Sequence, residues 1–358
     1  MTTSAQRQTD DDAEWLARSE NWRRRTQYPA SQRAKRERTR QPLILAGHGV
    51  SLRIEGGSLA IRNGFTHYPQ KQELHRFFKG DLNLPERIIV IDGSGSISFD
   101  VLSWLAEQDV SLIRIDWRGN IVCVAGKSAY AANPYRVQWQ RETRENELRR
   151  IEFSREIITQ KIENSIVTLE QTIPHTLAWE LARKSAYSSL DKLARKVPKS
   201  IIELMGLEAN AAAAYFRAWT GIPIQWRGTN RRPIPENWRH IAQRGTVLHQ
   251  SGNRNASHPV NTILNYAYTV LESELQIQAI AKGYDPMIGI LHESGNGEPA
   301  FIFDLIEPHR ATVDRKILKF VKENVFDAAD FAIRSDGVCR MNPEMARYVA
   351  AQAHGVSG

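Results

Sequence analysis

The chain has 358 residues, and 48 Lys and Arg against 40 Asp and Glu give it a formal net charge of +8. A hydrophobic fraction of 41% is that of globular proteins, which excludes a fibrous repeat or a wholly disordered chain, and the length suggests two domains. The sequence has no apolar run of about 18 residues, and we expect neither a transmembrane helix nor a signal peptide. Two cysteines exclude a disulfide framework and a four-ligand zinc site, so we expect a cytoplasmic setting without membrane contact.

The first segment of the chain, residues 1–40, is basic. It carries ten basic and six acidic residues and few apolar positions to bury, which predicts a flexible tail. Trp15 and Trp22 lie seven residues apart, and this spacing leaves open a short amphipathic helix docked elsewhere on the protein.

Residues 41–130 predict a compact β-rich domain with one helix. Short runs of alternating apolar and polar residues, separated by glycines, indicate strands at 43–47, 50–56, 59–64 and 65–68. Further along, the pattern predicts a strand, a turn and a second strand over 87–98, a helix over 100–108, and a hairpin of 110–116 with 120–126. The GSGS sequence at 93–96 lacks the spacing of a phosphate-binding loop and predicts a plain turn.

Residues 131–358 have helical periodicity. The predicted helices cover 138–172, 177–196, 199–221, 260–283, 303–324 and 343–353. We therefore predict an α+β multidomain fold, in which a small N-terminal β-rich, two-sheet domain precedes a larger all-α domain.

The net charge is unevenly distributed in the second half of the chain. Residues 208–254 hold seven Arg and two Glu, whereas residues 255–358 hold nine basic and thirteen acidic residues. A concentrated basic segment is typical of a protein that binds a polyanion, although a mildly basic protein needs no such partner. Tryptophans 219, 226 and 238 lie among the arginines, either as stacking platforms for unpaired bases or as core residues that anchor a loop. The arginines that we interpret as DNA-binding are Arg217, Arg227, Arg231, Arg232, Arg239, Arg244, Arg254 and Arg310.

Three segments carry residues suited to a hard cation. Glu208 lies in an alanine-rich helix, and His292 follows the apolar run MIGIL. Asp304 and Glu307 lie three residues apart at the start of the next helix. Converging carboxylates and an imidazole would hold Mg²⁺ or Mn²⁺ with positions open for phosphate oxygens. Each residue also fits an ordinary role, as a surface glutamate, a hydrogen-bonded loop histidine or carboxylates that complement a helix dipole.

Four motifs in the same order resemble a known family. They are MGLEANAAAAYF (205–216), HPVNTILNYAYTVLESEL (258–275), GYDPMIGILHE (283–293) and FIFDLIEPHR (301–310). Together with the turn-rich β region, they are similar to the CRISPR-associated endonuclease and integrase that acquires new spacers, over about residues 41–330. The resemblance implies that Glu208, His292 and Glu307 bind the metal, Mg²⁺ or Mn²⁺, and that Asp304 supports Glu307.

The resemblance also implies an activity and partners. Proteins of this family join the 3′-hydroxyl ends of a short prespacer duplex to CRISPR repeat DNA by transesterification, as part of prokaryotic antiviral defence. The implied assembly is a homodimer paired through the β domains, which binds double-stranded DNA with single-stranded 3′ ends and a small ferredoxin-like partner protein. Two alternatives remain open, a catalytically inactive DNA-binding scaffold of the same fold and a stand-alone transposon integrase of the same superfamily.

Overall fold

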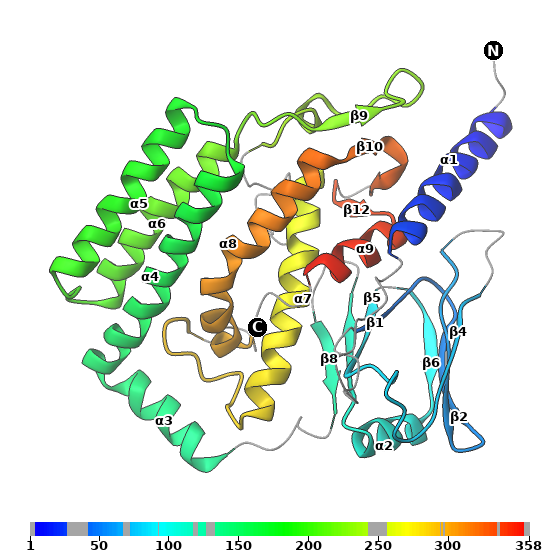
Figure 1. Cartoon of the computed structure of the whole chain (residues 1–358), viewed down its shortest axis with the longest axis horizontal. Coiled ribbons are helices and arrows are strands. Elements are labelled where there is room, and N and C mark those ends of the chain that lie inside the picture. Colours follow the sequence, from blue (N-terminus) through cyan, green and yellow to red (C-terminus); the bar gives the residue numbers. More distant parts are fainter. Residues whose placement is uncertain are drawn as a thin grey trace.

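A computed structural model shows a β-rich region followed by a helical one (Figure 1). This confirms the predicted α+β fold class. No helix among the described residues is long and apolar enough to span a membrane. The structure describes residues 4–26, 42–66, 72–91, 93–116, 121–126, 133–242, 256–293, 295, 298–334 and 337–353.

The first of two four-stranded sheets has the strand order β1-β5-β7-β8. Its first three strands are parallel, and β8 pairs with β7 antiparallel. Both faces of the sheet are covered, which explains why the strand sequences are nearly continuous apolar runs. On one face Ile44, Ile89 and Ile113 join the core of the helical region, and on the other Leu45 and Ile88 pack toward the second sheet. The strands are β1 (Leu43–Ala46), β5 (Arg87–Ile91), β7 (Ser111–Ile115) and β8 (Ile121–Ala125).

The second sheet has the order β4-β3-β2-β6, and helix α2 (Phe99–Glu107) packs against its core. Gly56 and Gly57 form the β2–β3 turn with φ values of 57° and 76°, which favour glycine. The strand predicted at 65–68 is not present in its described part, because Phe65 forms only an isolated bridge with His48. Residues 67 and 68 lie outside the described residues. The strands are β2 (Val50–Glu55), β3 (Ser58–Arg62), β4 (Leu74–Phe77) and β6 (Gly95–Ile97).

The helical region follows the predicted order with one break. The predicted helix over 138–172 is two helices, because Asn146 adopts an extended conformation and its side chain caps the second by accepting the N–H of Arg149. Two small sheets, β9 with β10 and β11 with β12, supplement the helices. The α-helices are α3 (Pro134–Glu145), α4 (Glu147–Thr172), α5 (Leu177–Arg195), α6 (Ile201–Trp219), α7 (Pro259–Ala281), α8 (Ala300–Glu323) and α9 (Pro343–Ala353). The shorter elements are β9 (Gln225–Arg227), η2 (Glu236–Trp238), β10 (Val325–Asp327), η4 (Ala328–Asp330), β11 (Phe331–Ile333) and β12 (Cys339–Met341).

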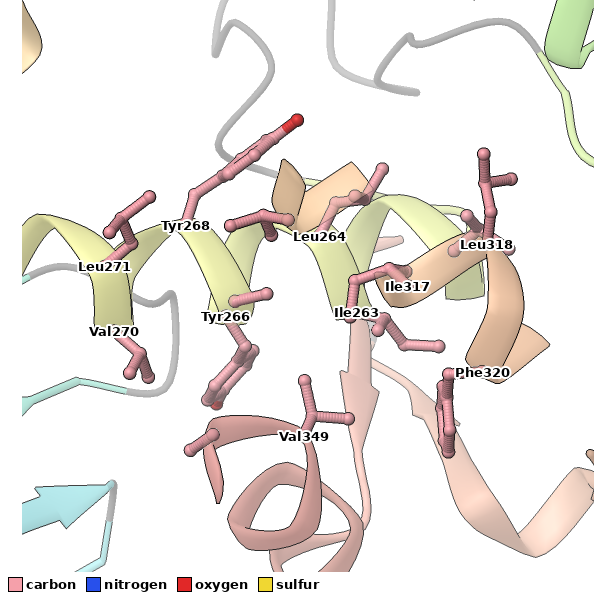
Figure 2. Packing of buried hydrophobic residues seen from close by; sticks show 14 of the residues in the cluster. Ile263, Leu264, Tyr266, Tyr268, Val270, Leu271, Ile317, Leu318, Phe320 and Val349 are labelled. Atoms are coloured by element: carbon pink, nitrogen blue, oxygen red, sulfur yellow. The ribbon is translucent and has the colours of Figure 1, made fainter. Parts of the chain in front are cut away.

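Helix α7 lies in the centre of the core. Apolar side chains are buried on all its sides, and they contact α8, α9 and the first sheet. Figure 2 shows Tyr266 pointing toward the helix that carries Val349, whereas Tyr268 points to the opposite side of α7. The buried ion pair of Glu274 with Arg87 of β5, 3.1 Å apart, joins this central helix to the sheet.

Helix α1 (Ser4–Arg25) corrects the prediction of a flexible tail. Trp22 is fully buried among aromatic rings, and Arg18 forms a bidentate ion pair with Asp330, with both N···O distances 2.6 Å. The indole N–H of Trp22 donates to the same carboxylate at 2.7 Å. The docked amphipathic helix is therefore the correct interpretation for Ser4–Arg25. The prediction of a tail failed because a count of charges does not show that Arg18 is buried. Residues 27–41 lie outside the described part of the chain.

The N-terminus of α7 depends on a buried histidine. The Nδ1 atom of His258 accepts the N–H of Val260 at 3.2 Å, and its Nε2 atom lies 3.1 and 3.0 Å from the carbonyl oxygens of Asn237 and His240. These contacts require a neutral ring with its proton on Nε2. Burial lowers the pKa of His258 below its usual value near 6.5, against the opposing effect of the two carbonyls.

We predict that Arg18→Ala lowers the free energy of unfolding by about 3–5 kcal/mol, because it leaves the carboxylate of Asp330 buried without a counter-charge. Urea denaturation measures this loss. The control is Arg24→Ala, which removes an exposed arginine from the same helix. Equal stability of the two variants would show that α1 is not anchored by this pair.

We also predict that His258 makes the protein less stable as the pH falls below about 6.5. The unfolded chain binds a proton at this residue near pH 6.5 and the folded chain binds it only at lower pH, so the unfolded state is favoured on acidification. The difference between the urea unfolding midpoints at pH 7.5 and pH 5.5 should therefore be smaller in His258→Asn than in the wild type. His175→Asn, a change at an exposed histidine, should leave the wild-type difference intact.

Candidate active site

A cavity of about 910 Å³ lies between α4, α6, α7, α8 and one surface of strand β8. Glu208 of α6, His292 of the loop before α8 and Glu307 of α8 all line it. Three residues that are up to 99 positions apart in the sequence therefore face one space. Val122 and Cys123 of β8 also line it, so the β-rich region contributes to the cavity.

Asp304 holds the loop that carries His292. Its carboxylate is fully buried and accepts the backbone N–H groups of Ile290, Leu291 and His292 at 2.5, 3.1 and 2.9 Å. A fourth contact joins Asp304 Oδ1 to His292 Nδ1 at 2.8 Å. Asp304 is thus occupied by the loop, and the imidazole is oriented with its Nε2 atom as the one left for a ligand.

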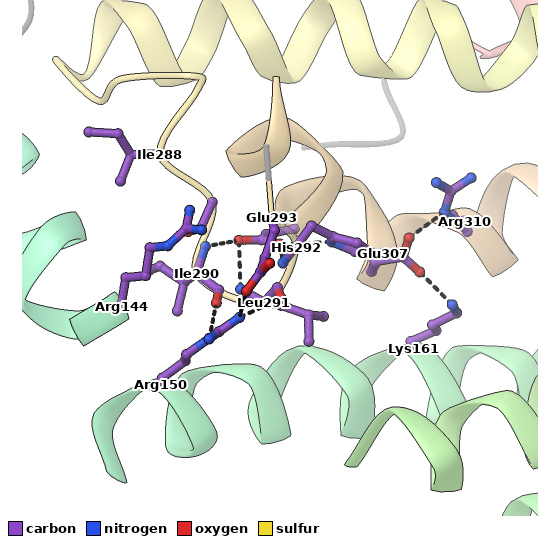
Figure 3. Close-up of polar contacts among 12 residues, drawn as sticks. Arg144, Arg150, Lys161, Ile288, Ile290, Leu291, His292, Glu293, Glu307 and Arg310 are labelled. Atoms are coloured by element: carbon purple, nitrogen blue, oxygen red, sulfur yellow. Dashed lines mark hydrogen bonds and ion pairs between the residues drawn. The ribbon is translucent and has the colours of Figure 1, made fainter. Parts of the chain in front are cut away.

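Side chains of α3 and α4 hold the same loop from beneath (Figure 3). Arg144 donates to the carbonyl of Gly289 at 3.1 Å, and Arg150 donates to the carbonyls of Ile290 and Leu291 at 2.7 and 3.3 Å. Gln140, which is fully buried, pairs with the backbone at the start of the loop. Sequence reasoning missed these residues, because charged residues on a long amphipathic helix are usually solvated. The burial of Gln140 is visible only in the structure, so the sequence offered no clear signal for these residues.

Glu208 and Glu307 meet through a lysine that the sequence analysis also missed. The Nζ atom of Lys161 lies 2.5 Å from Glu208 Oε1 and 2.5 Å from Glu307 Oε2. Burial by itself lowers the pKa of Lys161. The charges of Glu307 and Glu208 have the larger combined effect, so the pKa lies above its usual value. Lys161 occupies the apolar face of α4 between Ile158 and Ile162, and a charged residue in that pattern was the signal for it.

Arg310 completes the charge balance around Glu307. Its Nε atom donates to Glu307 Oε1 at 2.8 Å, and its guanidinium lies 4.9 Å from the centre of the Tyr268 ring. Burial by itself raises the pKa of Glu307. The positive charges of Arg310 and Lys161 together have the larger effect and lower the pKa from its usual value to about 2. Glu307 is therefore ionised at neutral pH.

Asp314 lies deeper in the cavity wall, one turn along α8 from Arg310. It accepts the phenol O–H groups of Tyr215, at 2.9 Å, and of Tyr268. Both tyrosines are buried, and burial followed by the charge of Asp314 raises the pKa of Tyr215 well above its usual value. The two phenols are neutral hydrogen-bond donors that fix α6 and α7 to α8.

The cavity residues suit a divalent cation by their chemistry. The pair of carboxylates already surrounds a cation, the ammonium of Lys161, and the buried Oε2 atom of Glu307 has no well-directed hydrogen bond among the described residues. Asp304 orients His292 as a carboxylate orients a metal-binding histidine. Within the described ranges, however, no three His, Cys, Asp or Glu side chains are already grouped as a metal site.

The predicted DNA-binding arginines separate into two groups. Arg310 lines the cavity. The others in the described residues are exposed or half-buried at the end of α6 and around β9 and η2, where several form ion pairs with acidic residues, including Arg231 and Arg232 with Glu14 of α1 at 3.8 and 3.7 Å. Such exposed pairs are weak and leave the arginines available to other anions. Arg244 and Arg254 lie outside the described residues.

The tryptophans of the same segment belong to the core. Trp219 and Trp238 are buried, and the Trp226 ring stacks on Trp238 with 5.8 Å between ring centroids. The Trp226 N–H donates to the Trp238 carbonyl at 2.9 Å. The burial of Trp219 and Trp238 contradicts base stacking for these two rings, whereas Trp226 is half-buried and packs against the same core.

Comparison with known proteins identifies relatives. Residues 43–354 match the model of the family described as CRISPR associated protein Cas1. A CRISPR-associated endonuclease Cas1 of Methanospirillum hungatei is 24% identical over 319 residues, which is 86% of each chain. Among solved structures, a casposase bound to integration product has a TM-score of 0.70 at 22% identity and covers 88% of this chain and 82% of its own. A CAS1 protein from Thermotoga maritima has a TM-score of 0.66 at 17% identity, with 88% and 89% covered.

We predict that Asp304→Asn lowers the free energy of unfolding by about 2–4 kcal/mol, because the amide brings N–H donors against backbone N–H donors and removes the charge that they contact. Hydrogen exchange of the Ile290–His292 amides should accelerate at the same time. Glu293→Gln, next to His292 with a side chain that is 72% exposed, provides the matched control and should change neither quantity. Unchanged exchange in Asp304→Asn would show that Asp304 does not hold the loop.

Proposed function

The chain belongs to the Cas1 family of CRISPR-associated proteins, and on that premise we propose that it is a divalent-metal-dependent endonuclease and integrase of CRISPR adaptation. Its substrate is double-stranded prespacer DNA with single-stranded 3′ ends, and its target is CRISPR repeat DNA. The reaction is transesterification, in which a 3′-hydroxyl attacks a phosphodiester, a new P–O bond forms and the bond to the leaving 3′-oxygen breaks. The proton of the attacking hydroxyl ends on the leaving oxygen through solvent.

One observation carries this proposal. Glu208, His292 and Glu307 line one cavity, and two of them already surround a cation in the form of Lys161. A site of carboxylates and an imidazole beside permanent positive charge is suited to phosphoryl transfer, where catalysis is mainly positioning and charge stabilisation. The inactive scaffold has no need for this arrangement.

Glu208, Glu307 and His292 would hold Mg²⁺ or Mn²⁺, and Asp304 acts on the site through His292 and its loop. When bound, the metal supplies positive charge to the phosphate in the transition state. Asp304 keeps the Nδ1 side of the His292 ring occupied, so that Nε2 is the ring nitrogen left for the metal. Arg310 can donate its remaining N–H groups to a phosphate oxygen while its Nε atom fixes Glu307.

The DNA should reach the cavity past the arginine segment around β9 and η2. Arg217, Arg227, Arg231 and Arg239 are exposed on this surface, and Arg232 is half-buried beside them. Arg244 and Arg254 belong to the same stretch of sequence. Their ion pairs with acidic neighbours would exchange for phosphate contacts, which makes binding sensitive to salt.

We further propose a homodimer paired through the β-rich region, in the prokaryotic cytoplasm, that works with a small ferredoxin-like partner protein. The second sheet and α2 support such an interface, since they expose large apolar side chains. Phe99 of α2 is 88% exposed, and Leu74 of β4 and Phe78, which directly follows β4, are 69% and 59% exposed.

We predict that Glu208→Gln, His292→Ala and Glu307→Gln each reduce strand transfer of a 3′-hydroxyl duplex in Mn²⁺ by about 100-fold or more, while DNA binding is retained. The assay follows joining of a labelled prespacer to repeat DNA, and a gel shift measures binding. Glu163→Gln removes an exposed carboxylate from α4 and should be as active as the wild type. Full activity of His292→Ala would overturn the assignment, and an inactive wild type would favour the scaffold alternative.

A further inference from the structure

Lys161 stands between the two carboxylates that the proposed function assigns to the metal. Its Nζ atom is equally close, 2.5 Å, to Glu208 Oε1 and to Glu307 Oε2. The lysine side chain is 18% exposed, as is that of Glu208, and that of Glu307 is 6% exposed. The ammonium is thus a partly buried cation that contacts both carboxylates, and Figure 3 shows its contact with Glu307.

The position of Lys161 is built into the packing of α4 against α8. Asn164 and Thr168, on the same side of α4, donate to the carbonyls of Pro308 and Ala311 at 2.8 and 2.7 Å. These bonds fix the register of the two helices around Glu307. Lys161 therefore reaches the carboxylates from a fixed backbone, unlike a surface lysine that finds an acidic partner by chance.

Two carboxylates in one cavity repel each other unless a cation lies between them. Lys161 supplies this cation, so Glu208 and Glu307 can stay close to each other without a metal. A divalent cation held between the same two carboxylates would take the place of the ammonium. The ammonium and the metal therefore cannot both occupy this position.

We propose that Lys161 is a built-in counter-ion of the site: it holds Glu208 and Glu307 together in the metal-free protein and withdraws when a divalent cation binds them. This inference rests on the proposed function, because it takes Glu208 and Glu307 as metal ligands. A lysine suits the exchange, since its ammonium is a compact charge on a flexible stem. The cavity of about 910 Å³ gives the displaced side chain room.

The first test measures Mn²⁺ binding by the full chain, from the electron paramagnetic resonance signal of free Mn²⁺. Lys161→Met keeps the length of the side chain and removes the competing charge, so its Mn²⁺ dissociation constant should be about tenfold lower than that of the wild type. Lys184→Met, at an exposed position of α5, should bind as the wild type does. Equal or weaker binding by Lys161→Met would overturn the inference.

Glu208→Gln separates a failure of this inference from a failure of the proposed function. Loss of Mn²⁺ binding in Glu208→Gln, with equal binding by the wild type and Lys161→Met, would leave the metal site in place and overturn only the counter-ion. If Glu208→Gln bound Mn²⁺ as tightly as the wild type, or if none of the proteins bound it, both proposals would be wrong.

A second test needs no variant and applies even if Lys161→Met does not fold. In the wild type, acetylation of Lys161 by an N-hydroxysuccinimide ester should be slow without metal, because both carboxylates hold the ammonium. Saturating Mn²⁺ should accelerate it by about tenfold, in proportion to the lost contacts. Mass spectrometry follows the modified peptides, with Lys184 as the internal control that Mn²⁺ does not change. Equal acetylation of Lys161 with and without bound Mn²⁺ would contradict its withdrawal.

Discussion

The contact between the buried carboxylate of Asp304 and the loop before α8 fixes the arrangement of the whole site. Three backbone N–H groups and the imidazole of His292 converge on this one group. A loop has no hydrogen-bond ladder to give it a shape, so it takes the shape that its partners impose. Because Asp304 and Glu307 lie three residues apart on α8, the same helix that shapes the loop also carries the carboxylate that faces Lys161.

Two layers of support act on this loop from opposite sides. Arg144 and Arg150 bind its carbonyl groups from α3 and α4, while Asp304 binds its N–H groups from α8. The arginines donate to the carbonyl groups of the loop, and the Asp304 carboxylate accepts its N–H groups. Protein side chains therefore satisfy these backbone groups. Such rigid support suits the reaction that we propose for this site, in which groups must be placed within a fraction of an ångström.

The sequence predicted the order of the helices and most strands of the β-rich region, because periodicity is a local property, but it missed strand β4. It also singled out Glu208, His292 and Glu307, which the structure brings to one cavity. It did not predict the roles of Lys161, Arg150 and Gln140, since each is one polar residue on a helix and its partners lie more than forty residues away. The break at Asn146 was also missed, because the apolar pattern continues across it and the cap depends on one side chain. The direct role of Glu307 and the supporting role of Asp304 were predicted from the family resemblance, and the geometry is in line with both as proposals.

Helix α1 has a consequence for how the chain reaches its native state. Arg18 and Asp330 are separated by 312 residues, and Ser19 contacts Asn342 across 323. A ribosome releases α1 first and its buried partners last, so the helix waits through most of synthesis with Trp22 exposed. Contacts of such long sequence separation close late in folding. The docking of α1 therefore has to wait for the segment around Asp330 and Asn342, and a chain that lacks this segment presents an uncovered tryptophan that chaperones or proteases can recognise.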